Sequence, residues 1–345
     1  MRKIFFLFFL ISNSLFAQDF ESVFKKYPNF NGVVLVADNG KIQYLKAQGL
    51  ANRQENIKLS TNSVFRICSI TKTFTAAIIL QLYEEGRLSL EDKMGKYLPN
   101  YKGEAKDRVN IHQLLTYSSG IKNLDQNTED MYALKLPIDT ILVKYCSGVL
   151  VSEPGKQFDY KNAEYIILGK IIEKIENKPF ELVLKERILD KIEMANSGML
   201  SNAKVIKGLA NSYLYDSESQ QFSNDDPYWI ENFYASGAMY STVQDLLKFD
   251  QAVFGSKLFK KSTLDLMLKP YPELWNVAYG FWVSENEYLG KKYLCSDRQG
   301  SISGSNTSWL HMINENKTFL IFANTDAVNL NNLRTDLIEV SLKKK

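Results

Sequence analysis

The sequence predicts an α/β protein of the α+β type, in which helices flank an antiparallel sheet and a mostly helical segment is inserted. Strand and hairpin patterns at both ends of the chain, and helical patterns between them, support this fold class. The 345 residues are 45% hydrophobic and 23% charged, an ordinary globular composition with ample length for a core. We expect a discontinuous sheet domain, residues 18–80 with 270–345, and a mostly helical domain, residues 81–269.

The first 17 residues have the pattern of a secretory signal peptide. A basic head, Met1–Lys3, precedes an apolar run at 4–11, and residues 12–17 give a plausible cleavage site after Ala17, although Leu15 is larger than the residue usually found there. The apolar run is too short to cross a bilayer as a helix, and no later stretch is long and apolar enough. We therefore expect a secreted or periplasmic mature protein without a membrane span.

Charge and metal-ligand patterns narrow the classes of partner. The chain carries a net charge of +3, and loss of Arg2 and Lys3 would leave +1. A nearly neutral chain lacks the excess positive charge that is typical of nucleic-acid-binding proteins, so we expect no nucleic acid as a partner. His112 and His311 have no metal-ligand spacing with cysteines or carboxylates, so we expect no zinc site. The three cysteines allow one disulfide and one free thiol, but their positions in the sequence do not show which two would pair. The oligomeric state cannot be derived from these patterns.

Two hairpins are predicted from paired strand patterns. Residues 33–37 and 42–47 flank an Asn-Gly turn, which is a strong hairpin signal. Residues 309–313 and 319–323 flank a polar turn near the other end of the chain, and residues 279–283 are a further strand candidate.

Helical periodicity is clearest after residue 72. Apolar and alanine residues extend to about Glu85, and Gly86 supplies a left-handed stop. Asn110 with Gln113 has the capping-box pattern, and Ser241 is a candidate cap of a later helix. The other expected helices cover about residues 19–26, 89–97, 111–117, 162–176, 180–189, 242–254 and 332–342.

Ser69 and Lys72 form the first candidate catalytic pair. Residues three apart on a helix share a face, so the amine lies one turn from the hydroxyl, and a free serine needs such an activating base. In the first turn of the helix, Ser69 would also meet free N–H groups. A solvated helix start is the alternative for this short pattern. Cys68 is a weaker nucleophile candidate, because the lysine register fits Ser69; a small buried residue is its more natural role.

Tyr160 and Asn162 form a second candidate group. They follow a Pro154-Gly155 turn and precede a helical pattern, so both side chains could point into a cleft. The alternatives are packing for Tyr160 and helix capping for Asn162. Lys161 between them is expected to face solvent, because lysine ends are almost never fully buried.

Arg298 and Gly300 form a third group, between two strand-like stretches. Glycine would let a substrate approach the backbone of a strand closely. The alternative is a Gly/Ser loop with a solvated arginine.

Taken in order, Ser69–Lys72, Tyr160–Asn162 and Arg298–Gly300 resemble the three motifs of the serine beta-lactamase and penicillin-binding protein superfamily, in its class C-like branch. Further similar blocks lie at residues 65–73, 109–120 and 237–246, and the resemblance extends from about residue 30 to about residue 325. The resemblance implies the same sheet-and-helix layout, with an active site in the cleft between the two parts.

The resemblance also implies a function: a serine hydrolase that forms an acyl-enzyme on an ester, amide or beta-lactam carbonyl of a small-molecule or peptide substrate. Ser69 would be the nucleophile, Lys72 and Tyr160 would share the base role, and Asn162 would orient Lys72 or the substrate. The backbone N–H groups of Ser69 and Ser301 would form the oxyanion hole. The family resemblance implies neither a metal nor an organic cofactor.

Two departures from the family pattern matter. Arg298 stands where lysine or histidine is usual, and Lys161 stands where a small residue is common. Arg298 keeps its charge and could grip a carboxylate, but it cannot shuttle a proton. A weak or inactive protein that binds acyl groups or peptidoglycan peptides is therefore the alternative function.

Overall fold

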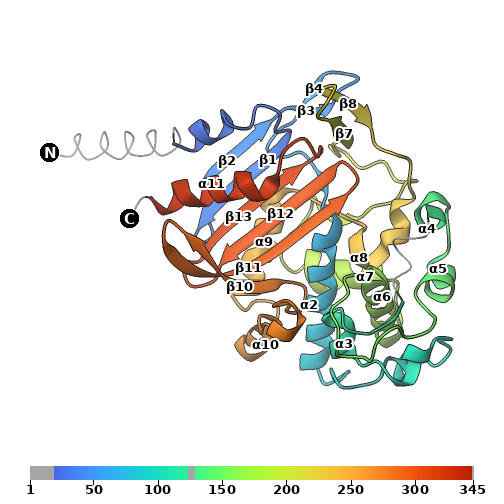
Figure 1. Ribbon diagram of the computed structural model, residues 1–345. Coiled ribbons are helices and arrows are strands. Elements are labelled where there is room, and N and C mark those ends of the chain that lie inside the picture. Colours follow the sequence, from blue (N-terminus) through green and yellow to red (C-terminus); the bar gives the residue numbers. More distant parts are fainter. Residues whose placement is uncertain (1–18, 123–128, 344–345) are drawn as a thin grey trace.

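The computed structural model describes residues 19–122 and 129–343, so the predicted signal peptide lies outside the described residues. Its main feature is a six-stranded antiparallel sheet in the order β10-β11-β12-β13-β1-β2 (Figure 1). The first strand of the chain, β1, pairs with the last strand, β13, on one side and with β2 on the other, so both ends of the chain build one sheet. This arrangement confirms the predicted fold class.

Both predicted hairpins are present. β1 (Gly32–Asp38) and β2 (Lys41–Gln48) are joined through Asn39 and Gly40, at φ 49° and 72°. An Asn-Gly pair suits these left-handed positions, which many hairpin turns require. β12 (Ser305–Met312) and β13 (Lys317–Ala323) form the second hairpin, with Asn306 opposite Ala323 at its open end.

The edge of the sheet differs from the prediction. β10 spans Trp282–Tyr288, so the strand expected at 279–283 begins three residues later. β11 (Lys291–Ile302) is a single strand of 12 residues that includes Arg298 and Gly300. These two residues therefore do not lie in the Gly/Ser loop that was the alternative for this segment. β10 pairs with β11 only as far as Asp297, and the last five residues of β11 extend beyond β10.

Helices cover both faces of the sheet (Figure 1). α11 (Leu330–Leu342) lies across β12 and β13 on one face, together with a helical segment at 19–24. α9 (Val243–Phe254) packs against β1 and β13 on the other face. α9 falls inside the segment assigned to the helical domain, and the division at residues 81 and 269 itself stays a prediction.

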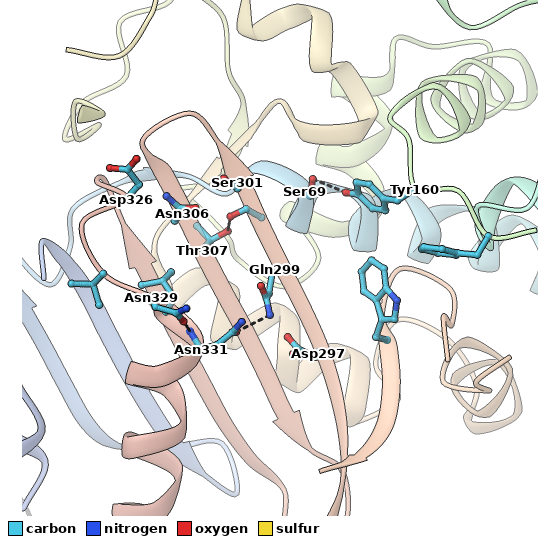
Figure 2. A pocket seen from close by; sticks show the side chains of 15 residues that line it. Ser69, Tyr160, Asp297, Gln299, Ser301, Asn306, Thr307, Asp326, Asn329 and Asn331 are labelled. Carbon is cyan, nitrogen blue, oxygen red and sulfur yellow. Dashed lines mark hydrogen bonds between the residues drawn. The ribbon is translucent and has the colours of Figure 1, made fainter. Parts of the chain in front are cut away.

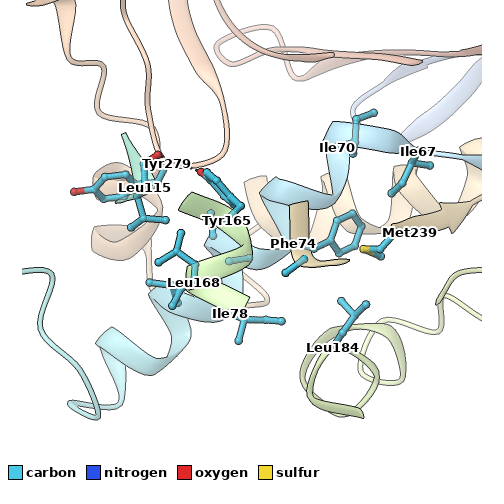
Figure 3. Close-up of a cluster of buried hydrophobic side chains, with 14 of the residues drawn as sticks. Ile67, Ile70, Phe74, Ile78, Leu115, Tyr165, Leu168, Leu184, Met239 and Tyr279 are labelled. Carbon is cyan, nitrogen blue, oxygen red and sulfur yellow. Dashed lines mark hydrogen bonds between the residues drawn. The ribbon is translucent and has the colours of Figure 1, made fainter. Parts of the chain in front are cut away.

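α2 (Thr71–Glu84) is the central helix of the helical part and is buried on nearly all sides. Its side chains Phe74 and Ile78 pack with Leu184 and Met239 in the main core (Figure 3). Gly86 ends the helix at φ 70°, as predicted. The helices around it are α3 (Ile111–Leu115), α4 (Glu129–Ala133), α5 (Ile138–Tyr145), α6 (Ala163–Glu176), α7 (Phe180–Leu184) with a π-helical continuation (Lys185–Leu189), α8 (Tyr234–Gly237) and α10 (Lys261–Met267).

Two local predictions are wrong. Residues 89–97 contain only a 3-10 turn, Met94–Lys96, because polar and turn-forming residues interrupt the pattern. Thr242, not Ser241, caps α9 by accepting the N–H of Asp245, whereas the Asn110–Gln113 capping box is present as predicted. The remaining short strands are β3 (Leu50–Asn52), β4 (Ile57–Lys58), β5 (Phe65–Arg66), β6 (Gly198–Met199), β7 (Tyr213–Asp216), β8 (Gln221–Asn224) and β9 (Met239–Ser241).

Candidate active site

Ser69 lies at the entrance to α2, on a 3-10 turn, Cys68–Ile70, that runs directly into the helix. Cys68 adopts φ 49°, a left-handed conformation that non-glycine residues rarely adopt and that is often found at functional sites. The serine lines a cleft of about 700 Å³, and its hydroxyl points toward Tyr160 (Figure 2).

Lys72 is fully buried one turn below the serine, as its spacing predicts. Its Nζ lies 3.2 Å from Ser69 Oγ and donates to Asn162 Oδ1 at 2.7 Å and to the Ser236 carbonyl at 2.8 Å. These three oxygens match the three N–H donors of an ammonium group, so the surroundings suit a charged Lys72.

Tyr160 is the second group on the serine, with its hydroxyl 2.8 Å from Ser69 Oγ. Burial by itself would raise the pKa of this phenol, but the nearby charges of Lys72 and Arg298, with hydrogen bonds to the phenolate, lower the pKa of Tyr160 to about 8. With this pKa, about a tenth of the tyrosine is ionised at pH 7 and more at higher pH. An ionised phenol can accept the serine proton.

Arg298 is only 1% exposed, so the interpretation as a solvated arginine is wrong. Its Nε donates to the Ser69 carbonyl at 2.8 Å, and its terminal nitrogens donate to the hydroxyls of Tyr160 and Tyr117 at 3.1 and 3.2 Å. The guanidinium is thus committed to the protein around the nucleophile. This geometry favours a fixed positive field over the expected grip on a substrate carboxylate.

Gly300 explains how β11 comes so close to the nucleophile. A Cβ at this position would lie 2.6 Å from the Ile67 carbonyl and 2.8 Å from the Ser69 nitrogen. Contacts this short do not occur, so only glycine allows the strand to pass here. The backbone after it, at Ser301, also lines the cleft.

Asn162 heads α6, but its side chain makes no capping hydrogen bond. Instead it accepts from Lys72 and donates to the Tyr132 hydroxyl at 2.9 Å, so the capping alternative is wrong. The expectation that Lys161 faces solvent is also wrong. Lys161 is 1% exposed, donates to the Ile121 carbonyl at 2.7 Å and pairs with Asp159 at 3.0 Å. A carboxylate and a carbonyl that reach its ammonium group make this burial possible.

Four residues of the site were not predicted: Tyr117, Tyr132, Ser236 and Trp282. Tyr117 and Trp282 surround Arg298 with aromatic rings, and the guanidinium lies 5.1 Å from the Trp282 ring. Tyr117 lies in the 109–120 block, which resembles the family, but the resemblance assigned no role to Tyr117 itself. Ser236 acts through its backbone carbonyl, and no side-chain pattern can reveal that contact.

The cysteines and histidines all have surroundings unlike those of the Ser69 site. Cys68 is fully buried, and burial raises the pKa of its thiol to about 12. All three cysteines are free and buried, so the disulfide that their number allowed is not formed. His112 bonds Tyr279, His311 bonds Asp250, and the described residues contain no group of three or more side chains that could hold a metal.

Comparisons with known proteins identify relatives of this chain. A penicillin-binding protein of Bacillus subtilis (strain 168) is 28% identical over 328 residues, which cover 89% of this chain and 70% of that protein. The teichoic acid D-alanine hydrolase of Staphylococcus aureus (strain MRSA252) is 28% identical over 268 residues, 74% of this chain, and the match spans only 62% of the hydrolase.

The fold is also found among solved structures. The D-amino acid amidase of Ochrobactrum anthropi SV3, solved with D-phenylalanine, superposes with a TM-score of 0.79 over 96% of this chain and 99% of the amidase, at 18% identity. The family model described as Beta-lactamase matches residues 20–339, nearly the whole described chain. The chain therefore belongs to the Beta-lactamase family, as a serine hydrolase related to the penicillin-binding proteins.

Proposed function

We propose that the protein hydrolyses an ester or amide through an acyl-enzyme on Ser69. The observation that carries this proposal is the convergence of the Tyr160 phenol and the Lys72 amine on one serine hydroxyl, at 2.8 and 3.2 Å, in an open cleft. A nucleophile with a base in hydrogen-bond reach, and with that base held by further groups, is the arrangement that acyl transfer needs.

Tyr160 is the proposed base, and Lys72 and Arg298 are the cations that favour its ionised form by lowering its pKa. The phenolate accepts the proton of Ser69 as Oγ attacks the carbonyl, and the same proton then passes to the leaving alcohol or amine. Water then enters and loses a proton to Tyr160 as it attacks the acyl carbonyl; the proton passes from Tyr160 to Ser69 Oγ as the ester bond breaks and the acid leaves. Asn162 and the Ser236 carbonyl fix the position of Lys72. General acid–base catalysis of this kind contributes roughly 10²–10⁴-fold to the rate.

The oxyanion would form between the backbone N–H groups of Ser69 and Ser301. The support for this is the close approach of β11 to the serine turn, where a Gly300 Cβ would lie 2.8 Å from the Ser69 nitrogen. Removing one oxyanion donor typically costs about 10²–10³ in rate. We infer that Gly300 serves the hole by allowing this approach.

The relatives suggest which acyl groups to try. One is named a teichoic acid D-alanine hydrolase, and a protein of the same fold is named a D-amino acid amidase. We therefore propose D-alanyl esters and D-amino acid amides as the first substrates, with short-chain esters as a simple assay. We expect little hydrolysis of beta-lactams, because Arg298 replaces the usual lysine or histidine.

The test is turnover of a p-nitrophenyl ester and of nitrocefin by the wild-type protein and by Ser69→Ala. We expect ester release by the wild type, and a loss of at least about 10³-fold in Ser69→Ala, since the nucleophile is gone. Ser60→Ala, at an exposed serine outside the cleft, is the matched control and should keep full activity. A Ser69→Ala variant that retains the wild-type rate would refute the assignment.

The alternative function, a weak or inactive acyl-binding protein, is favoured by one observation: Arg298 cannot exchange a proton. The same assay separates the two. A stable adduct on Ser69 without product release would indicate an acylatable binding protein, whereas repeated turnover indicates the hydrolase.

We further propose that the protein is exported, on the basis of the signal-peptide pattern at residues 1–17. No helix among the described residues is both long enough and apolar enough to be a membrane span. Export would place the enzyme among cell-wall substrates. Secretion of a full-length fusion, with N-terminal sequencing of the exported product, tests this proposal.

A further inference from the structure

The cleft has two chemically different sides. The serine side holds the buried cations Lys72 and Arg298 with Tyr160. The other side is a polar wall built from residues of β11, from the start of β12, and from the loop and first turn that lead into α11 (Figure 2). We refer to Asp297, Gln299, Asn306, Asp326, Asn329 and Asn331 as the polar wall.

No lysine or arginine is among the described residues that line the cleft. Both cations near Ser69 are held by protein atoms: the partners of Lys72 include Ser69, Asn162 and the Ser236 carbonyl, and Arg298 donates to the Ser69 carbonyl and to two tyrosines. A substrate carboxylate would therefore meet no free cationic side chain of the described chain. Binding a carboxylate here is therefore unfavourable for two reasons: the carboxylate loses hydrating water, and no cationic side chain of the described residues replaces that water.

The polar wall carries two carboxylates, and they differ. Asp297 is neutralised by a bidentate pair with Arg334, both distances being 2.8 Å. Asp326 accepts the N–H of Tyr215 on Oδ1 at 2.7 Å and forms no ion pair with a described residue. Figure 2 shows Asp326 toward one end of the wall and Ser69 toward the other. Asp326 is thus an exposed carboxylate without a cationic partner among the described residues, at the end of the cleft away from the nucleophile.

The amides of the wall leave hydrogen-bonding groups available. Gln299 donates to Asn331 Oδ1 at 2.8 Å, which leaves Gln299 Oε1 and Asn331 Nδ2 without a partner among the described residues. Asn329 uses its Oδ1 to cap α11, which leaves its Nδ2 available. A neutral or hydrogen-bond-donating group of a substrate can form hydrogen bonds with the polar wall. A substrate carboxylate would instead be repelled by the carboxylate of Asp326.

From these observations we infer that the enzyme selects substrates by charge. It acts on esters or amides whose part beyond the reacting carbonyl carries an ammonium or hydroxyl group, and it discriminates against those that carry a carboxylate there. Asp326 is the residue that sets this preference. The inference rests on the proposed function, because it concerns the substrate of the same serine.

Three fluorophosphonates of equal length, ending in an ammonium, a hydroxyl or a carboxylate, test the inference directly. Ser69 Oγ attacks phosphorus, a P–O bond forms, fluoride leaves with the bonding electrons, and the serine proton passes to Tyr160. The rate of labelling is measured by intact-mass spectrometry. We expect the ammonium and hydroxyl probes to label at least about tenfold faster than the carboxylate probe at low salt, and the difference to shrink at high salt.

Two variants assign the preference to Asp326. Asp326→Asn should reduce the ratio of ammonium to carboxylate labelling by about three- to tenfold, and Asp326→Lys should reverse it. Asp107→Asn removes an equal charge from an exposed position outside the cleft, and should leave the ratio unchanged.

The outcomes separate this inference from the proposed function. Equal labelling by the ammonium and carboxylate probes would overturn the charge preference while leaving Ser69 as the nucleophile. A preference that persists in Asp326→Lys would overturn the assignment to Asp326. An absence of labelling at Ser69 by all three probes would contradict the proposed function itself.

Discussion

Tyr160 links the proposed chemistry to a measurable pH dependence. Its pKa is lowered from the ordinary value near 10 to about 8, and a base must be deprotonated to act. We therefore expect kcat/KM to rise with pH through about 8 and then level off. Tyr160→Phe should lower kcat/KM by roughly 10²–10⁴ and abolish this rise. The measurement is the pH profile of ester hydrolysis in both proteins.

Arg298 is expected to act on that profile as a positioning residue. Its guanidinium contacts the Tyr160 hydroxyl and helps to lower the pKa of that phenol. Arg298→Gln removes the charge, so the midpoint of the profile should move to higher pH, whereas Arg298→Lys keeps the charge and should shift it less. An unchanged midpoint in Arg298→Gln would mean that the arginine has only a structural role.

Gly300 offers a steric test. In Gly300→Ala the new Cβ would clash with backbone atoms of Ile67 and Ser69, so the strand must move away from the serine turn. We expect kcat/KM to fall at least about 10²-fold, because a displacement of about 1 Å near the chemistry costs that much. Gly290→Ala, where the Cβ meets no neighbour within 4 Å, is the control and should keep its activity despite its left-handed backbone.

At the scale of elements, the cap of α9 gives a stability prediction. Thr242 Oγ1 accepts the N–H of Asp245 at 3.1 Å. Thr242→Ala should lower the free energy of unfolding by about 1 kcal/mol, whereas Thr242→Ser keeps the hydroxyl and should lose less. Urea denaturation of the three proteins measures the difference. Equal losses in both variants would assign the effect to the methyl group instead.

The sequence predicted elements best where local signals are strong. The Asn39-Gly40 turn, the Gly86 stop and the Asn110–Gln113 capping box are each decided by residues close together in the chain, and each is present. The prediction of a helix at 89–97 was wrong, because turn-forming residues in this segment outweigh its short apolar pattern.

Distant contacts account for the remaining errors. Lys161 is buried because Asp159 and the Ile121 carbonyl reach its ammonium group, and Arg298 is buried because Tyr117 and Tyr160 surround it. The Ser69–Lys72 pair followed from helical spacing alone. Its meeting with Tyr160 did not, since 91 residues separate Ser69 from the tyrosine. That convergence was expected only from the family resemblance.

At the scale of the whole molecule, Glu164 is expected to make stability depend on pH. It is fully buried and accepts the N–H of Ser119 on one oxygen, while its other oxygen has no partner among the described residues. Burial raises the pKa of Glu164 to about 8, and the nearby Lys161 offsets this only in part. The folded protein thus holds a proton that the unfolded chain loses above about pH 4.5.

The sign of the effect follows from this proton. Between about pH 4.5 and 8 the folded state binds more protons than the unfolded state, so the contribution of Glu164 to stability falls as the pH rises. Glu164→Gln should make stability less dependent on pH over this range, and Glu55→Gln, at an exposed carboxylate, should not. The measurement is the urea midpoint of each protein at about pH 5 and about pH 9. If the midpoint changes by the same amount in Glu164→Gln and in the wild type, the assignment to Glu164 is wrong.

Three elements meet at the nucleophile. The turn into α2 supplies Ser69 and the loop before α6 supplies Tyr160 (Figure 2), and β11 supplies Arg298. The most direct test of this account is to quench the wild-type protein in acid during turnover of a p-nitrophenyl ester and to map the acyl group by peptide mass spectrometry. The account predicts the acyl group on Ser69 alone, with far less of it in Tyr160→Phe. An acyl group on Cys68 or elsewhere, or product release with no covalent adduct at any time point, would contradict it.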